Sequence, residues 1–200
     1  MSRAWIGVDV GGKRKGFDVA VIDESRLVDL RRRLDVTAVA GLVEEHRPEV
    51  VAIDSPCCFA APGRRTRESE LELNREVCGI RWTPDEEMAQ GPYYEWVHEG
   101  LALHRALEGS SKSEVIEVFP TASWTRWLGP RGQLSRSRWT SKGVQALALE
   151  GIPAKTNQDQ RDAIAAAVTA RECSAGGTEA LGGEIVVPKV PPDGRTYLSR

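Results

Sequence analysis

The sequence of 200 residues lacks any apolar run close to the roughly 20 residues of a membrane-spanning helix. The segment from Met1 to Asp9 reaches a charged residue too early for the apolar stretch of a signal peptide. The sequence also lacks a zinc-binding pattern. None of its four cysteines forms a C-x-x-C pair, and no histidine pair has zinc-ligand spacing. We therefore expect a cytoplasmic protein with reduced thiols, no membrane contact and no structural zinc.

The chain also lacks an excess of positive charge, because its formal net charge is -2. A polyanionic partner would be slightly repelled by the average field, so local basic clusters would have to bind it. Such clusters occur at 13–15, 31–33, 64–67 and 126–142. The composition, with 40% hydrophobic and 28% charged residues, is typical of a folded domain. We expect a single domain over 1–188, with a helical insertion around 57–110 and a tail over 189–200.

The first quarter of the chain predicts three strands and a helix. Apolar segments at 4–10 and 17–22 indicate two antiparallel strands joined by a glycine-bearing basic loop, and 27–34 supplies a third strand. A helix capped by Asp35 or Thr37 should end before Pro48. The near-continuous apolar run over 49–54 then indicates a buried strand.

The remaining chain predicts helices separated by two more strands. Helices are expected over 66–77, 93–107, 139–149 and 158–172, and strands over 114–119 and 184–187. The segment 121–138 is interpreted as a short helix and a loop, and 174–183 as a loop. Alternating strands and helices of this kind favour an α/β fold with a mixed sheet.

Carboxylates occupy unusual places in this pattern. Asp9 lies near the end of an apolar strand, Asp54 is the last residue of a buried strand, and Glu117 lies within a third strand. An ionised, buried and unpaired carboxylate costs several kcal/mol, so something must offset that cost. Groups at the carboxyl ends of strands in open α/β sheets line the crevice where ligands bind.

Two further acids begin the alanine-rich helix. Asp159 and Asp162 are spaced i, i+3, so they share one face of its first turns. If these acids converge with the strand carboxylates, their mutual repulsion favours a hard divalent cation, Mg²⁺ or Mn²⁺. Two such ions about 4 Å apart could activate water and stabilise a leaving oxygen in phosphodiester hydrolysis. Each acid taken alone also has an ordinary structural explanation, and it is their joint placement that indicates a site.

The order of these motifs resembles a known family, the predicted ribonuclease-H-like nucleases grouped as domain of unknown function 429, which are distantly similar to RuvC-type resolvases. The matching motifs are Gly7-Val-Asp9-Val, Ala52-Ile-Asp54-Ser-Pro56, Glu117-Val-Phe-Pro120, Asp159-Gln-Arg-Asp162-Ala and Glu184-Ile-Val-Val-Pro188. The resemblance spans roughly Trp5 to Pro188 and is weak in the middle third.

The resemblance implies a ribonuclease-H-like mixed sheet with flanking helices. It also implies a metal-dependent nuclease that acts on DNA or RNA through catalytic, metal-binding acids, here Asp9, Asp54, Glu117, Asp159 and Asp162. One departure is Gln158, which stands where family members often carry a further acid. Whether Asp159 or Asp162 is the main ligand therefore stays open.

Substrate phosphates could be neutralised by Arg64, Arg67 and Lys13 near the expected site. Salt pairing of the arginines with neighbouring glutamates is the favoured alternative for them. The tryptophans Trp124, Trp127 and Trp139 lie among arginines, a mixture that suits nucleic acid and equally suits cation–π packing.

Two other functions remain open. The turn Asp9-x-Gly11-Gly12 also suits the phosphate-binding hairpin of actin-like phosphotransferases, although those enzymes need two such domains and this chain has room for about one. A catalytically silent ribonuclease-H-like binding protein would keep the fold and lose the chemistry.

Overall fold

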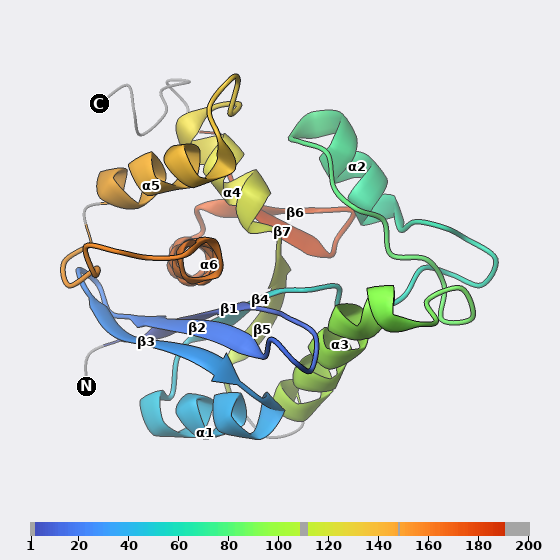
Figure 1. Cartoon of the computed structure of the whole chain (residues 1–200), viewed down its shortest axis with the longest axis horizontal. Helices are drawn as coiled ribbons and strands as arrows, with labels where there is room; N and C mark the ends of the chain where they lie inside the picture. The colour runs from blue at the N-terminus through green and yellow to red at the C-terminus, as the bar shows by residue number, and fades with distance from the viewer. Residues whose placement is uncertain (1–2, 109–111, 148, 191–200) are drawn as a thin grey trace.

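A computed structural model describes residues 3–108, 112–147 and 149–190 of the chain. It contains one mixed seven-stranded sheet in the order β3-β2-β1-β4-β5-β7-β6, with helices on both faces (Figure 1). The strands are β1 (Trp5–Asp9), β2 (Phe17–Ile22), β3 (Leu27–Leu34), β4 (Val50–Asp54), β5 (Glu114–Val118), β6 (Thr178–Leu181) and β7 (Ile185–Pro188). The helices are α1 (Val36–His46), α2 (Glu68–Glu76), the 3₁₀ turn η1 (Pro92–Tyr94), α3 (Glu95–Glu108), α4 (Pro120–Leu128), α5 (Arg136–Ala146) and α6 (Gln158–Ser174). This confirms the predicted α/β class and is compatible with a ribonuclease-H-like fold.

The strand pairing aligns the ends of β1 and β4. The first three strands form an antiparallel meander, whereas β1, β4, β5 and β7 run parallel. Asp9, the last residue of β1, is the register partner of Asp54, the last residue of β4. The carboxyl ends of these two strands therefore meet at one edge of the sheet, as the sequence predicts.

Helix α6 lies unusually close to the sheet, against β1, β2 and β4. A Cβ atom built on Gly7 of β1 would lie 2.1 Å from the backbone nitrogen of Ala167 and 2.2 Å from the carbonyl oxygen of Ala163. The absence of a side chain at Gly7 and the alanines of α6 make this approach possible. Asn157 caps the helix by accepting the Gln160 N–H, which fixes where α6 begins.

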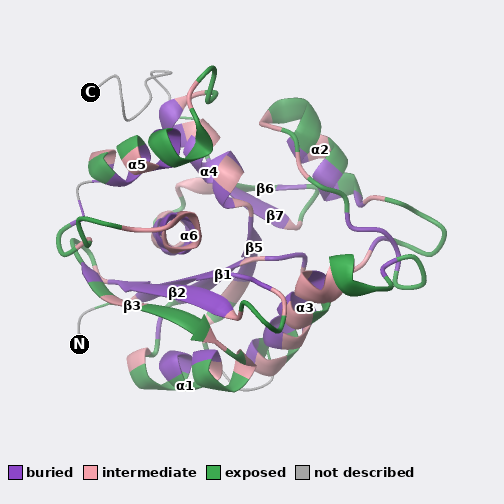
Figure 2. Ribbon diagram, viewed as in Figure 1, coloured by how far each residue is buried: buried purple, intermediate pink, exposed green. Residues whose placement is uncertain are grey.

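The two faces of the sheet have separate apolar cores. One core joins α4, α5 and α6 to side chains such as Trp5 and Ala52, and the other joins α1 and α3 to side chains such as Val8 and Ile53. Figure 2 shows the central strands buried between these helix layers. Successive residues of a strand point to opposite faces of the sheet, so the position of a carboxylate in its strand determines the face to which it points.

Two sequence predictions differ from the structure in detail. Helix α5 begins at Arg136, capped by the Ser135 hydroxyl, three residues before the predicted start. Residues 178–181, predicted as part of a loop, form the strand β6, which pairs with β7. Glu179 and Ala180 in the middle of this strand are exposed and only Leu181 is buried, so the strand has no apolar alternation to reveal it. The predicted 189–200 tail lies outside the described residues from position 191 onward.

The segment around 57–110, expected as a helical insertion, contains α2, η1 and α3, which lie between β4 and β5 in the chain. Within the part of the chain that the structure describes, no helix combines the length and apolar character that crossing a bilayer requires.

Candidate active site at the carboxyl ends of the strands

The carboxyl ends of β1 and β4 present two aspartates to α6. Gly7 contacts α6 and Ala52 belongs to the core beneath it, so the alternation of strand residues places Asp9 and Asp54 on this same face. Parallel register partners lie side by side, and the charge of Asp9 raises the pKa of Asp54. Two acids that are 45 positions apart in the sequence thus share one site.

Lys15 joins this pair to the N-terminal turn of α6. Its Nζ lies 3.2 Å from Asp9 Oδ2 and 3.0 Å from Asp159 Oδ1. The lysine belongs to the loop between β1 and β2, which turns back over the end of β1 through hydrogen bonds to the Gly12 carbonyl. A cation therefore already lies between a strand carboxylate and a helix carboxylate.

Asp162 is the most completely hydrogen-bonded member of the group. It accepts from Trp124 Nε1 at 3.1 Å, from Gln158 Nε2 at 3.0 Å and from Arg136 Nη2 at 2.8 Å. Its side chain is nearly inaccessible to solvent, and burial raises its pKa although Arg136 acts in the opposite direction. Gln158, the departure from the family pattern, thus acts as a donor to Asp162.

Asp54 contrasts with Asp162 because its carboxylate forms no hydrogen bond or ion pair with any described residue. Burial raises the pKa of Asp54 well above its ordinary value, and the charges of Asp9 and Asp162 raise it further. Burial likewise raises the pKa of Asp9 to about 7, against the lowering effect of Lys15. The cluster of Asp9, Asp54, Asp159 and Asp162, which we call the aspartate cluster, is therefore short of positive charge.

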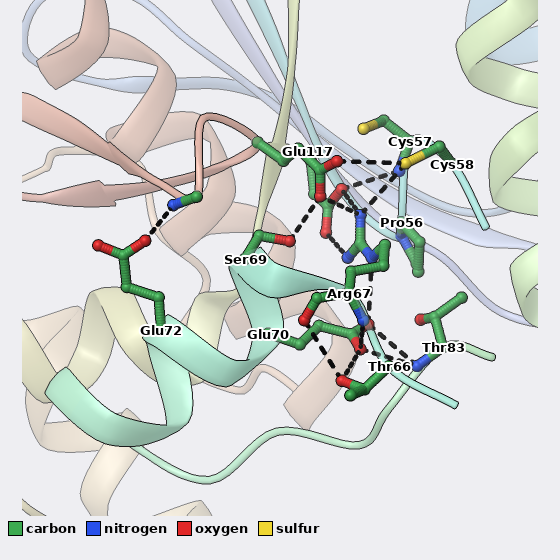
Figure 3. A network of polar contacts seen from close by, with 12 residues as sticks. Pro56, Cys57, Cys58, Thr66, Arg67, Ser69, Glu70, Glu72, Thr83 and Glu117 are labelled. Atoms are coloured by element: carbon green, nitrogen blue, oxygen red, sulfur yellow. Dashed lines mark hydrogen bonds and ion pairs between the residues drawn. The ribbon is translucent and has the colours of Figure 1, made fainter. Parts of the chain in front are cut away.

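Glu117 does not join the aspartate cluster directly. Its register partner on β4 is Ile53, whose side chain belongs to the core on the α3 side, so Glu117 points to the opposite face of the sheet. There the guanidinium of Arg67 binds both Glu117 oxygens, with Nη1 at 2.7 Å from Oε2 (Figure 3). The Cys57 N–H donates to the same carboxylate at 2.8 Å.

Arg67 is the centre of this second group, which we call the Arg67 hub. It also pairs with Glu70 and Glu184, each at 3.2 Å, and only 5% of it is exposed. Its guanidinium binds three glutamates, as the salt-pairing alternative anticipates for Glu70. Its predicted role as a phosphate ligand stays a prediction that these contacts do not support.

The other predicted substrate ligands are exposed. Arg64 pairs with Glu68 at 3.2 Å, and Lys13 Nζ lies 4.0 Å from Glu99. The Lys13 N–H donates to the Glu95 carboxylate at 3.1 Å, beside Gly12. The glycine turn that could cradle a phosphate in an actin-like enzyme thus already faces a carboxylate.

All five predicted acids nevertheless line one cavity of about 960 Å³. Lys15, Arg67 and Arg136 also line it, together with Gln158. The aspartate cluster and the Arg67 hub are therefore two carboxylate groups on the wall of a single cavity.

The donor set of the aspartate cluster fits a hard divalent cation, because every candidate ligand atom is a carboxylate oxygen. The unpartnered Asp54 beside Asp9 is the observation that supports this fit. In the arrangement of the described residues, however, no three His, Cys, Asp or Glu side chains are placed to hold a metal ion together. Lys15 and Arg136 provide the positive charge in that arrangement. A metal can therefore bind only when these two side chains move away from their aspartates.

Sequence reasoning missed the site roles of Lys15 and Arg136, which it grouped with general basic clusters. The spacing offers a signal for Lys15, because a residue in a short loop between antiparallel strands lies beside the end of the first strand. No sequence signal pairs Arg136 with Asp162, since they belong to different helices.

Comparison with known proteins gives one match. The model of a family described as a protein of unknown function (DUF429) matches residues 7–186. No curated protein and no solved structure matches the chain.

Proposed function

Since the chain belongs to the DUF429 family, whose description assigns no activity, we propose from its site that it is a divalent-metal-dependent phosphodiester hydrolase acting on nucleic acid. The observation that carries the proposal is the carboxylate of Asp54, partly buried, beside Asp9 and without a partner among the described residues. Neighbouring carboxyl groups with raised pKa values occur where a protein binds a cation or transfers a proton.

The residues that would hold Mg²⁺ or Mn²⁺ are Asp9 and Asp54 from the strands and Asp159 and Asp162 from α6. The bound cation would supply a water of lowered pKa and stabilise charge on the leaving oxygen of a phosphodiester. Trp124 and Gln158 orient the carboxylate of Asp162 by donating hydrogen bonds to it.

Glu117 receives a different role in this proposal. By accepting the Cys57 N–H and both arms of the Arg67 guanidinium, it holds the turn that follows Asp54. We expect it to position Asp54 from the opposite face of the sheet, rather than to bind the cation as the sequence predicts.

Lys15 supports the proposal because its ammonium lies between Asp9 and Asp159. The position favours a cation, and the lysine side chain is about half exposed, so it has room to withdraw toward solvent. Once released, the same ammonium can contact a substrate phosphate near the carboxylates.

The test compares Asp54→Asn with a matched control, Asp35→Asn. Asp35 caps α1 on the other side of the sheet, and asparagine caps a helix as well as aspartate, so the control removes the same charge without touching the site. Millimolar Mn²⁺ should raise the melting temperature of the native protein and of Asp35→Asn, because it binds the folded state. Asp54→Asn should lose this shift and all Mn²⁺-dependent cleavage of labelled DNA and RNA oligonucleotides.

In EDTA, Asp54→Asn should be at least as stable as the native protein, because it relieves repulsion between carboxylates. No Mn²⁺ shift in the native protein would refute the metal site. A shift without cleavage of any oligonucleotide would favour the catalytically silent alternative.

A further inference from the structure

Besides the two carboxylate groups, the lining of the cavity includes residues that carry hydrogen-bond donors. Arg81 and Thr83 line it from the segment after α2, and Arg131 and Trp139 line it from the α4–α5 loop and from α5. We call these residues the donor arm. The carboxylates and the donor arm share one cavity, so a ligand can contact both.

The two arginines of the donor arm differ from the other arginines that line the cavity. Arg67 and Arg136 pair with carboxylates, whereas no hydrogen bond or ion pair joins the guanidinium of Arg81 or Arg131 to another described residue. Both side chains are exposed. Each guanidinium is therefore a free, permanently charged group that faces a cavity.

Two buried polar atoms of these lining residues also lack partners among the described residues. Thr83 Oγ1 and Trp139 Nε1 are inaccessible to solvent and form no hydrogen bond with any described residue, although their residues line the cavity. A buried polar atom without a partner costs about 1–3 kcal/mol, so such atoms usually have a ligand or a water. They are a second observation, independent of the arginines, that indicates a ligand.

The chemistry of the donor arm favours an anion. Guanidinium and indole groups only donate hydrogen bonds, and a hydroxyl can donate as well. The carboxylate nearest to Thr83 is Glu70, which accepts the Thr83 N–H at 3.0 Å and is neutralised by Arg67. Arginine binds both carboxylate and phosphate through two parallel N–H bonds, and phosphate is the anion that a nucleic-acid substrate of the proposed function supplies.

The size of the cavity decides how large the ligand is. Small-molecule sites span roughly 300–1,000 Å³, and this cavity of about 960 Å³ is at the upper end of that range. The cavity therefore has room for a ligand that carries more than one phosphate group.

We infer that the donor arm of Arg81, Thr83, Arg131 and Trp139 binds a second phosphate of the substrate, one that is not cleaved. The substrate is then a nucleic-acid strand with at least two phosphates, rather than a mononucleotide or a simple phosphomonoester. The inference rests on the proposed function for the identity of the cleaved phosphate, but the binding that it describes needs no catalysis.

The experiment measures binding without cleavage. Fluorescence anisotropy in EDTA at low salt follows labelled hexathymidylate and hexauridylate with the native protein, Arg81→Ala, Arg131→Ala and the double variant. The matched control is Arg138→Ala, because Arg138 is an exposed arginine on α5 that does not line the cavity. Melting temperatures confirm that every variant is folded.

Each single variant should bind about tenfold more weakly, and the slope of log affinity against log salt should fall by roughly one per lost contact. Arg138→Ala should bind like the native protein. Thymidine monophosphate and inorganic phosphate should compete at least a hundredfold less well than the unlabelled hexamer. Comparing the two hexamers shows whether DNA or RNA is preferred.

Three results would overturn the inference: no hexamer binding, unchanged binding by the double variant, or an equal loss in Arg138→Ala. Its failure is distinguishable from failure of the proposed function. Arginine-dependent binding without Mn²⁺-dependent cleavage would leave the donor arm standing and remove the hydrolase. Mn²⁺-dependent cleavage with an unchanged KM in the double variant would support the hydrolase and refute the role of the donor arm.

Discussion

The aspartate cluster and the Arg67 hub border the same cavity, yet they neutralise their carboxylates very differently. In the hub, one guanidinium binds both oxygens of Glu117 and also pairs with Glu70 and Glu184. In the cluster, Lys15 and Arg136 face four aspartates, and Asp54 has no hydrogen-bonding partner among the described residues. Each glutamate of the hub accepts at least one hydrogen bond, whereas Asp54 of the cluster accepts none from the described residues.

Burial alone does not separate the two groups, because Glu117 of the hub is 5% exposed and Asp9 of the cluster is 7% exposed, while Asp54 is only partly buried. The difference lies in the partners available to each acid. Burial raises the pKa of Asp9, Asp54 and Asp162, which means that the fold disfavours their ionised forms. Acids with strongly shifted pKa values are concentrated at functional sites, whereas an ion-pair network in which every group has a partner can be purely structural.

The largest expected effect comes from breaking the hub. Arg67→Met should leave Glu117 and Glu70 buried without a cation and lower the free energy of unfolding by about 3–5 kcal/mol. Urea denaturation measures the loss. The matched control is Arg64→Met, since Arg64 forms an exposed pair with Glu68 that contributes at most about 1 kcal/mol. Equal losses in the two variants would mean that the hub is not the structural group.

The next effect concerns the pH dependence of stability. Because the folded state holds the Asp9 proton up to about pH 7 and the unfolded state releases it near pH 4, folding takes up a proton between these values. The free energy of unfolding should therefore fall as pH rises through this window, by up to about 1.4 kcal/mol per pH unit for this site. Asp9→Asn should remove this contribution and also abolish metal-dependent activity.

Urea denaturation of Asp9→Asn and the native protein at pH 5 and pH 7.5 isolates the site. His104 contributes an opposite slope, since burial lowers its pKa, but it does so in both proteins. Relative to the native protein, the variant should gain stability at the higher pH. A variant that is destabilised at pH 7.5 would show that Asp9 is a structural residue.

The smallest effect concerns Lys15, whose ammonium group pairs with Asp9 and Asp159 in the aspartate cluster. Lys15→Met should bind Mn²⁺ roughly tenfold more tightly, because the metal no longer displaces the ammonium between Asp9 and Asp159. Isothermal titration calorimetry measures the affinity directly. Lys13→Met is the control, since Lys13 is exposed and does not contact the cluster. Weaker Mn²⁺ binding by Lys15→Met would instead make the lysine a supporting residue.

The parts of the fold that the sequence predicts well are those with apolar periodicity. The strands ending at Asp9 and Asp54 and the alanine-rich helix beginning near Asp159 all lie where the pattern puts them. The edge strand β6 was missed because its exposed side chains carry no such pattern. The start of α5 was displaced because Ser135 caps the helix and its first three residues, Arg136 to Arg138, are all polar.

The candidate site divides in the same way. Alternation along a strand could have separated Glu117 from Asp54, but only if the register between β4 and β5 were known. The sequence shows neither that register nor the approach of Arg67 from α2. It therefore grouped Glu117 with four acids that the structure places on the other face.

The sequence by itself determined which acids end buried strands and begin α6, because local hydrophobic patterns and helix caps are short-range properties. Only the tertiary structure decided which of those acids have a partner. Ion pairs such as Lys15 with Asp159, Arg136 with Asp162 and Arg67 with Glu117 join residues from separate elements. Whether a carboxylate is neutralised depends on distances of a few ångströms between such elements, and the packing of α6 and α2 against the sheet sets those distances.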